Sequence, residues 1–119
     1  MKELIDKLLD KIMERQHNTQ FSNNNLAQVI LFGSAARNEA TIYSDLDVVI
    51  VVDKQEHIRP AMRMLGGISG EINWPLDLLV VDLEQFDRKK VIGGVFHDAN
   101  THGIVLFDRA ATKNDSSKS

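Results

Sequence analysis

The apolar residues of this chain fall into short runs separated by polar segments, and the spacing within each run predicts the local structure. Near the N-terminus they recur every three or four positions, which predicts an amphipathic helix over residues 2–15. The polar stretch 17–25 predicts a loop. Two continuous apolar runs, 27–32 and 48–52, are typical of buried strands, and Gly33 ends the first of them.

A capping pattern follows the second strand. Residues 53–56 place an aspartate three positions before a glutamate, which indicates the start of a helix. We expect that helix to carry Ile58, Met62 and Leu65 on one face and to end at the glycine pair 66–67.

The last third of the chain predicts a strand, a helix and a short final strand. The strand covers residues 71–81, with its pattern interrupted near Trp74-Pro75, and Asp82 then repeats the capping pattern. The helix that follows is expected to run through Gly93-Gly94, and residues 103–107 to form the last strand. Its expected apolar face consists of Val91, Ile92, Val95 and Phe96.

These elements predict an α/β (α+β) fold in which a small mixed β-sheet is flanked by helices. The 119 residues suit a single domain, which we assign to residues 1–110, and the polar composition of residues 111–119 predicts a disordered tail. Hydrophobic residues make up 43% of the chain, enough for a core.

Charge and residue usage exclude several classes of function. The chain has no cysteine, so disulfides and thiolate metal sites are excluded. Its net charge of −3 argues against nucleic acid as the main partner. No apolar run is long enough to span a bilayer, and the charged N-terminal segment lacks the apolar region of a signal peptide, so we expect a cytoplasmic protein without a membrane partner.

Two carboxylates stand at the start of the second predicted strand. Asp45 and Asp47 are two positions apart, so along a strand their side chains project the same way. Adjacent carboxylates repel each other unless a cation lies between them, and oxygen ligands suit Mg²⁺ or Mn²⁺. Taken alone, the pair also fits two solvated residues at a strand entrance.

Residues upstream of this pair favour a phosphate site. Gly33 ends a strand where the backbone must approach another group closely, and Ser34 begins a short helical turn with free amides and a hydroxyl. Arg37, one turn later, can reach the same phosphates with its guanidinium group. The sequence therefore predicts a polyphosphate cradle that leads into a metal-binding pair.

A third carboxylate is expected because two metal ions need more than two bridging groups. Asp77 is the best candidate, since it lies in an otherwise apolar strand segment where an unpaired carboxylate is costly to bury. A strand-start position facing water is the alternative interpretation. Asp53 and Asp82 also follow apolar strands, and we interpret both as helix caps.

Three other motif interpretations fail on spacing. A Walker P-loop requires a Gly-Lys pair, which the chain lacks. In haloacid-dehalogenase-type phosphotransferases the apolar strand precedes the two aspartates, whereas here the run 48–52 follows them. The four histidines do not show zinc-ligand spacing, and the last two are expected at the surface near a helix end: His17, His57, His97 and His102.

The order of Gly33-Ser34, ten intervening residues and Asp45-x-Asp47 resembles the signature of the DNA polymerase beta-like nucleotidyltransferase superfamily. The short length resembles the minimal nucleotidyltransferase (MNT) branch, whose members often pair with HEPN-domain proteins in toxin–antitoxin modules. One position differs, because Asn38 stands where the family commonly has glycine after the arginine. Asparagine tolerates a left-handed backbone better than most residues.

The resemblance implies an enzyme that transfers a nucleoside monophosphate, with AMP from ATP as the expected group, to a hydroxyl. It implies that Gly33, Ser34 and Arg37 bind the nucleotide and that Asp45, Asp47 and Asp77 are catalytic and hold Mg²⁺ or Mn²⁺. The expected acceptor is a tyrosine of a partner HEPN toxin in a hetero-oligomer, which makes this chain the antitoxin. Two alternatives stay open: an aminoglycoside-type transferase acting on a small molecule, and a catalytically weak antitoxin that acts by binding alone.

Overall fold

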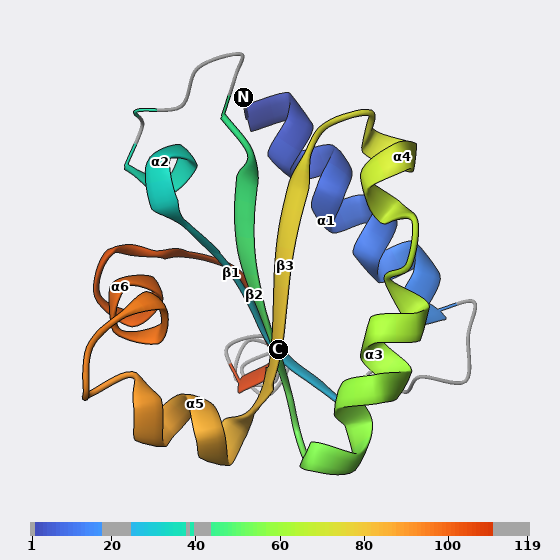
Figure 1. Ribbon diagram of the computed structural model, residues 1–119. Coiled ribbons are helices and arrows are strands. Elements are labelled where there is room, and N and C mark those ends of the chain that lie inside the picture. Colours follow the sequence, from blue (N-terminus) through green and yellow to red (C-terminus); the bar gives the residue numbers. More distant parts are fainter. Residues whose placement is uncertain (1, 18–24, 38, 40–43, 111–119) are drawn as a thin grey trace, which may run out of the picture.

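The computed structural model describes residues 2–17, 25–37, 39 and 44–110, which form seven helical segments and four strands (Figure 1). In chain order the elements are α1 (Lys2–His17), β1 (Leu26–Phe32), α2 (Gly33–Ala36), β2 (Leu46–Val52), the 3-10 turn η1 (Gln55–His57), α3 (Ile58–Met64), α4 (Ile68–Ile72), β3 (Leu76–Asp82), α5 (Leu83–Lys89), α6 (Val95–His102) and β4 (Ile104–Asp108). The expected loop at 18–24, Asn38, most of the connector before Ser44 and the expected tail at 111–119 lie outside the described residues.

The four strands form one mixed sheet in the order β3-β2-β1-β4. β2 pairs in parallel with β3, while β1 pairs antiparallel with both β2 and β4. The parallel pair requires a crossover, which α3 and α4 provide. The predicted fold class, a small mixed sheet flanked by helices, is therefore confirmed.

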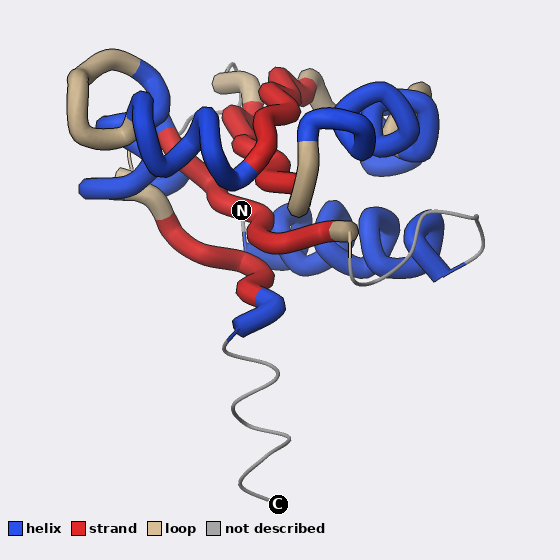
Figure 2. Tube along the Cα trace, turned by 90° about the horizontal axis from the view of Figure 1, so that it is seen from below, coloured by secondary structure: helices blue, strands red, loops and turns tan. Residues whose placement is uncertain are grey.

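Helices cover both faces of the sheet, with α1, α3 and α4 on one side and α2, α5 and α6 on the other (Figure 1). Seen from below, the strands run between these two groups of helices (Figure 2). Alternate residues of β2 therefore enter different cores: Val48 and Ile50 pack with α1, α3 and α4, whereas Val49 and Val51 pack with α5 and α6. Because β2 is buried on both faces, its sequence is a continuous apolar run rather than an alternating one.

The predicted face of α3 is partly wrong. Ile58 packs against the core and Leu65 is buried as expected, but the side chain of Met62 is 58% exposed. Ala61 and Met64 are buried instead. They lie three and six positions after Ile58, and this moves the centre of the buried stripe toward Ala61 and leaves Met62 at its margin.

The segment expected to begin the third strand is helical. α4 buries Ile68 and Ile72, four positions apart, on one face, so β3 begins only at Leu76. Left-handed residues bound this short helix at both ends, with Gly67 at φ 77° and Asn73 at φ 55°. The interruption near Trp74-Pro75 was thus the true start of the strand.

The two predicted helix caps differ in outcome. Asp82 caps α5 as expected, because its Oδ1 accepts a hydrogen bond of 2.8 Å from the backbone N–H of Gln85. Asp53 does not cap a helix; Lys54 occupies the cap position of η1 without a side-chain bond. Asp53 instead accepts a hydrogen bond from Arg109 at 3.0 Å, which links the end of β2 to the residue after β4.

The helix predicted to run through the second glycine pair is divided into α5 and α6. Gly93 and Gly94 have φ values of 133° and 79°, which other residues rarely adopt, and the chain turns there. Val91 and Ile92 consequently lie outside both helices and are 73% and 78% exposed. The expected shared apolar face is therefore wrong, although Phe96 still packs on the core residue Phe86.

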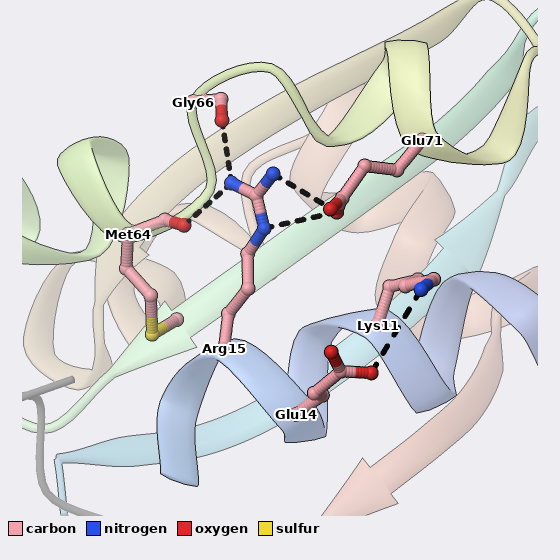
Figure 3. Close-up of polar contacts among 6 residues, drawn as sticks. All are labelled: Lys11, Glu14, Arg15, Met64, Gly66 and Glu71. Atoms are coloured by element: carbon pink, nitrogen blue, oxygen red, sulfur yellow. Dashed lines mark hydrogen bonds and ion pairs between the residues drawn. The ribbon is translucent and has the colours of Figure 1, made fainter. Parts of the chain in front are cut away.

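Arg15 of α1 joins the helices on its side of the sheet (Figure 3). Its guanidinium group donates to the carbonyl oxygen of Met64 at 2.9 Å, to that of Gly66, and to Oε2 of Glu71 at 2.9 and 3.1 Å. The last carbonyls of a helix have no partner within it, so this arginine satisfies the end of α3 and ties α4 to α1.

We expect Arg15→Met to lower the free energy of unfolding by about 1–3 kcal/mol, because two carbonyls and a carboxylate lose their donor. Urea denaturation measures this change. Lys11→Met is the matched control, since Lys11 of the same helix is half-buried and makes a 3.8 Å ion pair with the exposed Glu14. Its expected cost is below about 0.5 kcal/mol. Equal midpoints for the two variants would contradict a structural role of Arg15.

Candidate active site

Two of the predicted site carboxylates lie directly opposite each other on neighbouring strands. Asp47 is the second residue of β2 and Asp77 the second residue of β3, and the parallel register pairs them. Adjacent strands are about 4.8 Å apart, and residues paired in this way point to the same face of the sheet. Both side chains lie on the sheet face that packs against α5 and α6, two positions before Val49 and Leu79 of that core. Neither aspartate is fully buried.

Asp45 lies just before β2 rather than within it, so the expectation of two carboxylates on one strand is only half right. Asp45 and Asp77 are exposed, whereas Asp47 is half-buried. Asp77 is both the third carboxylate of the group and a residue at the start of an edge strand. The exposed strand-start position, which was the alternative interpretation, is therefore the one observed, and a metal-binding role of Asp77 stays a prediction.

The electrostatics of the group centre on Asp47. Its partial burial raises the pKa of its carboxyl above the usual 3.8, and the negative charges of Asp77 and then Asp45 raise that pKa further. Three carboxylates thus lie close enough to repel one another in the folded chain. Such an arrangement is costly to the fold and is relieved by a bound cation.

Gly33 lies against the central carboxylate. A Cβ atom built on this glycine would overlap Oδ2 of Asp47 and lie 3.3 Å from its Cγ. Gly33 also has a φ of 74°, in the left-handed region that favours glycine. The backbone conformation therefore favours glycine, and a Cβ would in addition displace the Asp47 carboxylate. Asp47 is the group that the backbone was predicted to approach closely.

Ser34 and Arg37 stand on the short turn that follows. Ser34 is half-buried in α2, and Arg37 follows the last residue of that helix. The Arg37 guanidinium group lies 3.6 Å from Oδ2 of Asp98 and 3.5 Å from Oε2 of Glu39. No local pattern in the sequence indicates Asp98, which lies on α6 and is brought near α2 only by the packing of those helices (Figure 1).

The donor set fits Mg²⁺ or Mn²⁺ because all three side chains are carboxylates and their charges are mutually destabilising. Among the described residues, no group of three or more histidine, cysteine, aspartate or glutamate side chains is arranged so that it could hold a metal ion by itself. Mg²⁺ commonly binds through one or two carboxylates and takes other ligands from water and substrate phosphates. An open group of aspartates beside Gly33 suits that mode of binding.

The two predicted surface histidines, His97 and His102, are exposed on α6, with His102 as its last residue. Among the helices that the structure describes, none is both long and apolar enough to cross a membrane.

Comparison with solved structures shows where this fold occurs. A candidate nucleotidyltransferase from Sulfolobus solfataricus is similar over 90% of this chain and 88% of its own, with 23% identity and a TM-score of 0.50. A toxin–antitoxin structure with AMP-PNP is similar over 88% of this chain and 77% of its own, with 18% identity and a TM-score of 0.53. A mutant of the toxin–antitoxin MntA-HpeT covers 88% of this chain and 76% of its own, at 18% identity and a TM-score of 0.50.

No curated protein sequence matches the chain. The family model described as nucleotidyltransferase domain matches residues 9–95, which include α2 and all three site aspartates. That match spans most of the 119 residues. The chain therefore belongs to the nucleotidyltransferase domain family, a family of transferase enzymes.

Proposed function

We propose that this chain transfers AMP from ATP to a tyrosine hydroxyl of a partner HEPN-domain toxin and thereby acts as the antitoxin. The observation that carries the catalytic part is the crowding of Asp47 by Asp77 and Asp45 beside Gly33. The partner is supported by similarity in fold to toxin–antitoxin structures, one of which contains AMP-PNP, a non-hydrolysable ATP analogue. It is also supported by the resemblance to the minimal branch of the family.

The proposed reaction is an in-line displacement at the α-phosphorus of ATP. The acceptor oxygen forms a new bond to phosphorus, the bond to the bridging oxygen of pyrophosphate breaks, and the hydroxyl proton passes to a base. Asp77 is assigned as that base because it is exposed at the edge of the sheet, where a bulky acceptor can reach it. When Mg²⁺ is bound, it neutralises charge on the triphosphate and favours ionisation of the acceptor hydroxyl.

The metal ligands in this proposal are Asp45, Asp47 and Asp77. The nucleotide ligands are Gly33, Ser34 and Arg37, with the first-turn amides of α2 and the serine hydroxyl facing the phosphates. Arg37 already has acidic partners in Asp98 and Glu39, so phosphate binding exchanges one set of anions for another. Before ATP binds, these ion pairs hold the guanidinium group close to the position from which it would contact the phosphates.

The proposed acceptor lies on another molecule because the described chain is almost entirely used to build the sheet and its covering helices. The test is a labelling experiment. Purified protein is incubated with α-³²P-labelled ATP, Mg²⁺ and the protein encoded by the neighbouring gene, and the label is followed by gel electrophoresis. We expect label on the partner, and its loss with Asp45→Asn or Asp77→Asn.

The matched control is Asp10→Asn, which makes the same chemical change on the exposed side of α1 and should leave labelling intact. Tight binding of the partner without label, unchanged in the site variants, would show an antitoxin that acts by contact alone and would overturn the proposal. In a parallel incubation with an aminoglycoside in place of the partner, label on the aminoglycoside, together with none on the partner, would overturn the assignment of the acceptor and leave nucleotidyl transfer standing.

A further inference from the structure

Trp74 connects the start of β3 to the segment that carries Asp45. Its indole N–H donates a hydrogen bond of 2.9 Å to the backbone carbonyl of Ser44, thirty positions earlier in the chain. Ser44 immediately precedes Asp45, and neither residue belongs to β2. The indole therefore holds a piece of backbone that the sheet itself does not.

The residue after Trp74 holds the other side of the same aspartate. The N–H of Leu46 donates to the carbonyl of Pro75 at 3.0 Å. Asp45 is thus flanked by two hydrogen bonds, one at the preceding carbonyl and one at the following amide, and both end on the dipeptide Trp74-Pro75. β3 begins directly after this dipeptide and carries Asp77 as its second residue.

Hydrogen bonds with Ser69 fix the turn that carries Trp74. The Ser69 hydroxyl donates to the carbonyl of Trp74 at 2.6 Å, and the Trp74 N–H donates to the carbonyl of Ser69 at 3.3 Å. Asn73, just before it, adopts the left-handed conformation that reverses the chain. Trp74 also packs against the core that includes Ile68 and Ile72 of α4. The donor nitrogen therefore has a defined place relative to the sheet.

We propose that Trp74 is a positioning residue that holds the backbone of Asp45 near Asp47 and Asp77 against the mutual repulsion of their carboxylates, so that Mg²⁺ binding requires little movement of that backbone. The proposal rests on the proposed function of this site. Because Asp45 lies outside the strand, its place depends on the hydrogen bonds at its two ends. Without the indole bond the like charges favour its movement away from Asp47.

The test separates the hydrogen bond from the bulk of the side chain. Replacing Trp74 by 3-benzothienylalanine substitutes sulfur for the N–H group with almost the same shape, whereas 7-azatryptophan keeps the N–H. Two quantities are compared: the Mg²⁺ concentration that gives half-maximal labelling, and the rise in melting temperature that Mg²⁺ causes without nucleotide. Since the chain contains one tryptophan, only this position is altered.

We expect benzothienylalanine to raise the Mg²⁺ midpoint about tenfold and to shrink the Mg²⁺-dependent rise in melting temperature. The KM for ATP at saturating Mg²⁺ should change little, and 7-azatryptophan should restore the wild-type Mg²⁺ midpoint. Arg109→Met controls for lost stability, because Arg109 donates to Asp53 beyond the opposite end of β2 from Asp45. It should lower the melting temperature without changing the Mg²⁺ midpoint.

Equal Mg²⁺ dependence of the benzothienylalanine variant and the wild type would overturn the positioning role, and so would an equal shift in Arg109→Met. These results leave the proposed function intact if the wild type labels its partner. If the wild type transfers no nucleotide, the proposed function fails, and the Mg²⁺-dependent melting temperatures still decide whether Trp74 positions Asp45.

Discussion

Replacing Asp47 by asparagine is expected to lower nucleotidyl transfer by about a hundredfold to a thousandfold and to raise the melting temperature of the metal-free protein. The two effects have one cause. Asparagine keeps the size of the side chain but removes the charge that is half-buried and repelled by Asp77 and Asp45. The substitution thus raises stability and lowers activity, as is common where function requires like charges to lie together.

The pH dependence of stability follows from the raised pKa of Asp47. Between the unfolded value of 3.8 and the higher folded value, the native state binds more protons than the unfolded state. Stability contributed by this group therefore falls as the pH rises through that window and then stays low. Asp47→Asn should remove this fall. The variant should therefore be more stable than the wild type at neutral pH, and this difference should disappear well below pH 3.8.

Thermal denaturation with and without Mg²⁺ checks this prediction. Wild-type protein should gain stability from Mg²⁺ at neutral pH, whereas Asp47→Asn should start higher and gain little. Asp10→Asn should behave as wild type in both conditions. An Asp47→Asn protein that is less stable than wild type in the absence of metal, or that keeps the full Mg²⁺ effect, would contradict the account of the carboxylate group.

The second large effect is expected at Gly33. Gly33→Ala should destabilise the fold by about 2–4 kcal/mol and lower activity by about a hundredfold, because it combines an unfavourable backbone conformation with a collision. The new methyl group would overlap Oδ2 of Asp47 and displace the central carboxylate. Equilibrium denaturation and the labelling assay measure the two parts.

Gly67→Ala is the matched control for the backbone. Gly67 has a φ of 77°, close to the 74° of Gly33, but a Cβ there meets nothing within 4 Å. Its cost should be the conformational part alone, about 1–2 kcal/mol, with transfer activity retained. The difference between the two variants then isolates the contact with Asp47.

A double variant tests that contact directly. With Asp47→Ala in place, the Gly33 methyl group loses the oxygen it would overlap, and the nearest remaining contact is ordinary packing against Cβ at 3.5 Å. Gly33→Ala should then cost no more than Gly67→Ala. Additive costs in the double variant would mean that Gly33 is required for its backbone conformation alone.

Local patterns in the sequence predicted much of this architecture. The apolar runs gave β1 and β2 within one or two residues, because a strand buried on both faces has a continuous apolar sequence. The Asp82 cap gave the start of α5, since capping is a contact between residues three positions apart. Two of the predictions that failed, at Met62 and along α4, concern short segments where few residues define a period.

The chain by itself therefore predicted which residues would carry the chemistry: a glycine that ends a strand, an aspartate pair opening the next, and a further aspartate in an apolar segment. Only the tertiary structure decided how they meet. The pairing of Asp47 with Asp77, the hydrogen bond from Trp74 to Ser44 and the ion pair of Arg37 with Asp98 join residues thirty or more positions apart. Such contacts depend on the register between strands and the packing of helices across the sheet, which no local pattern encodes.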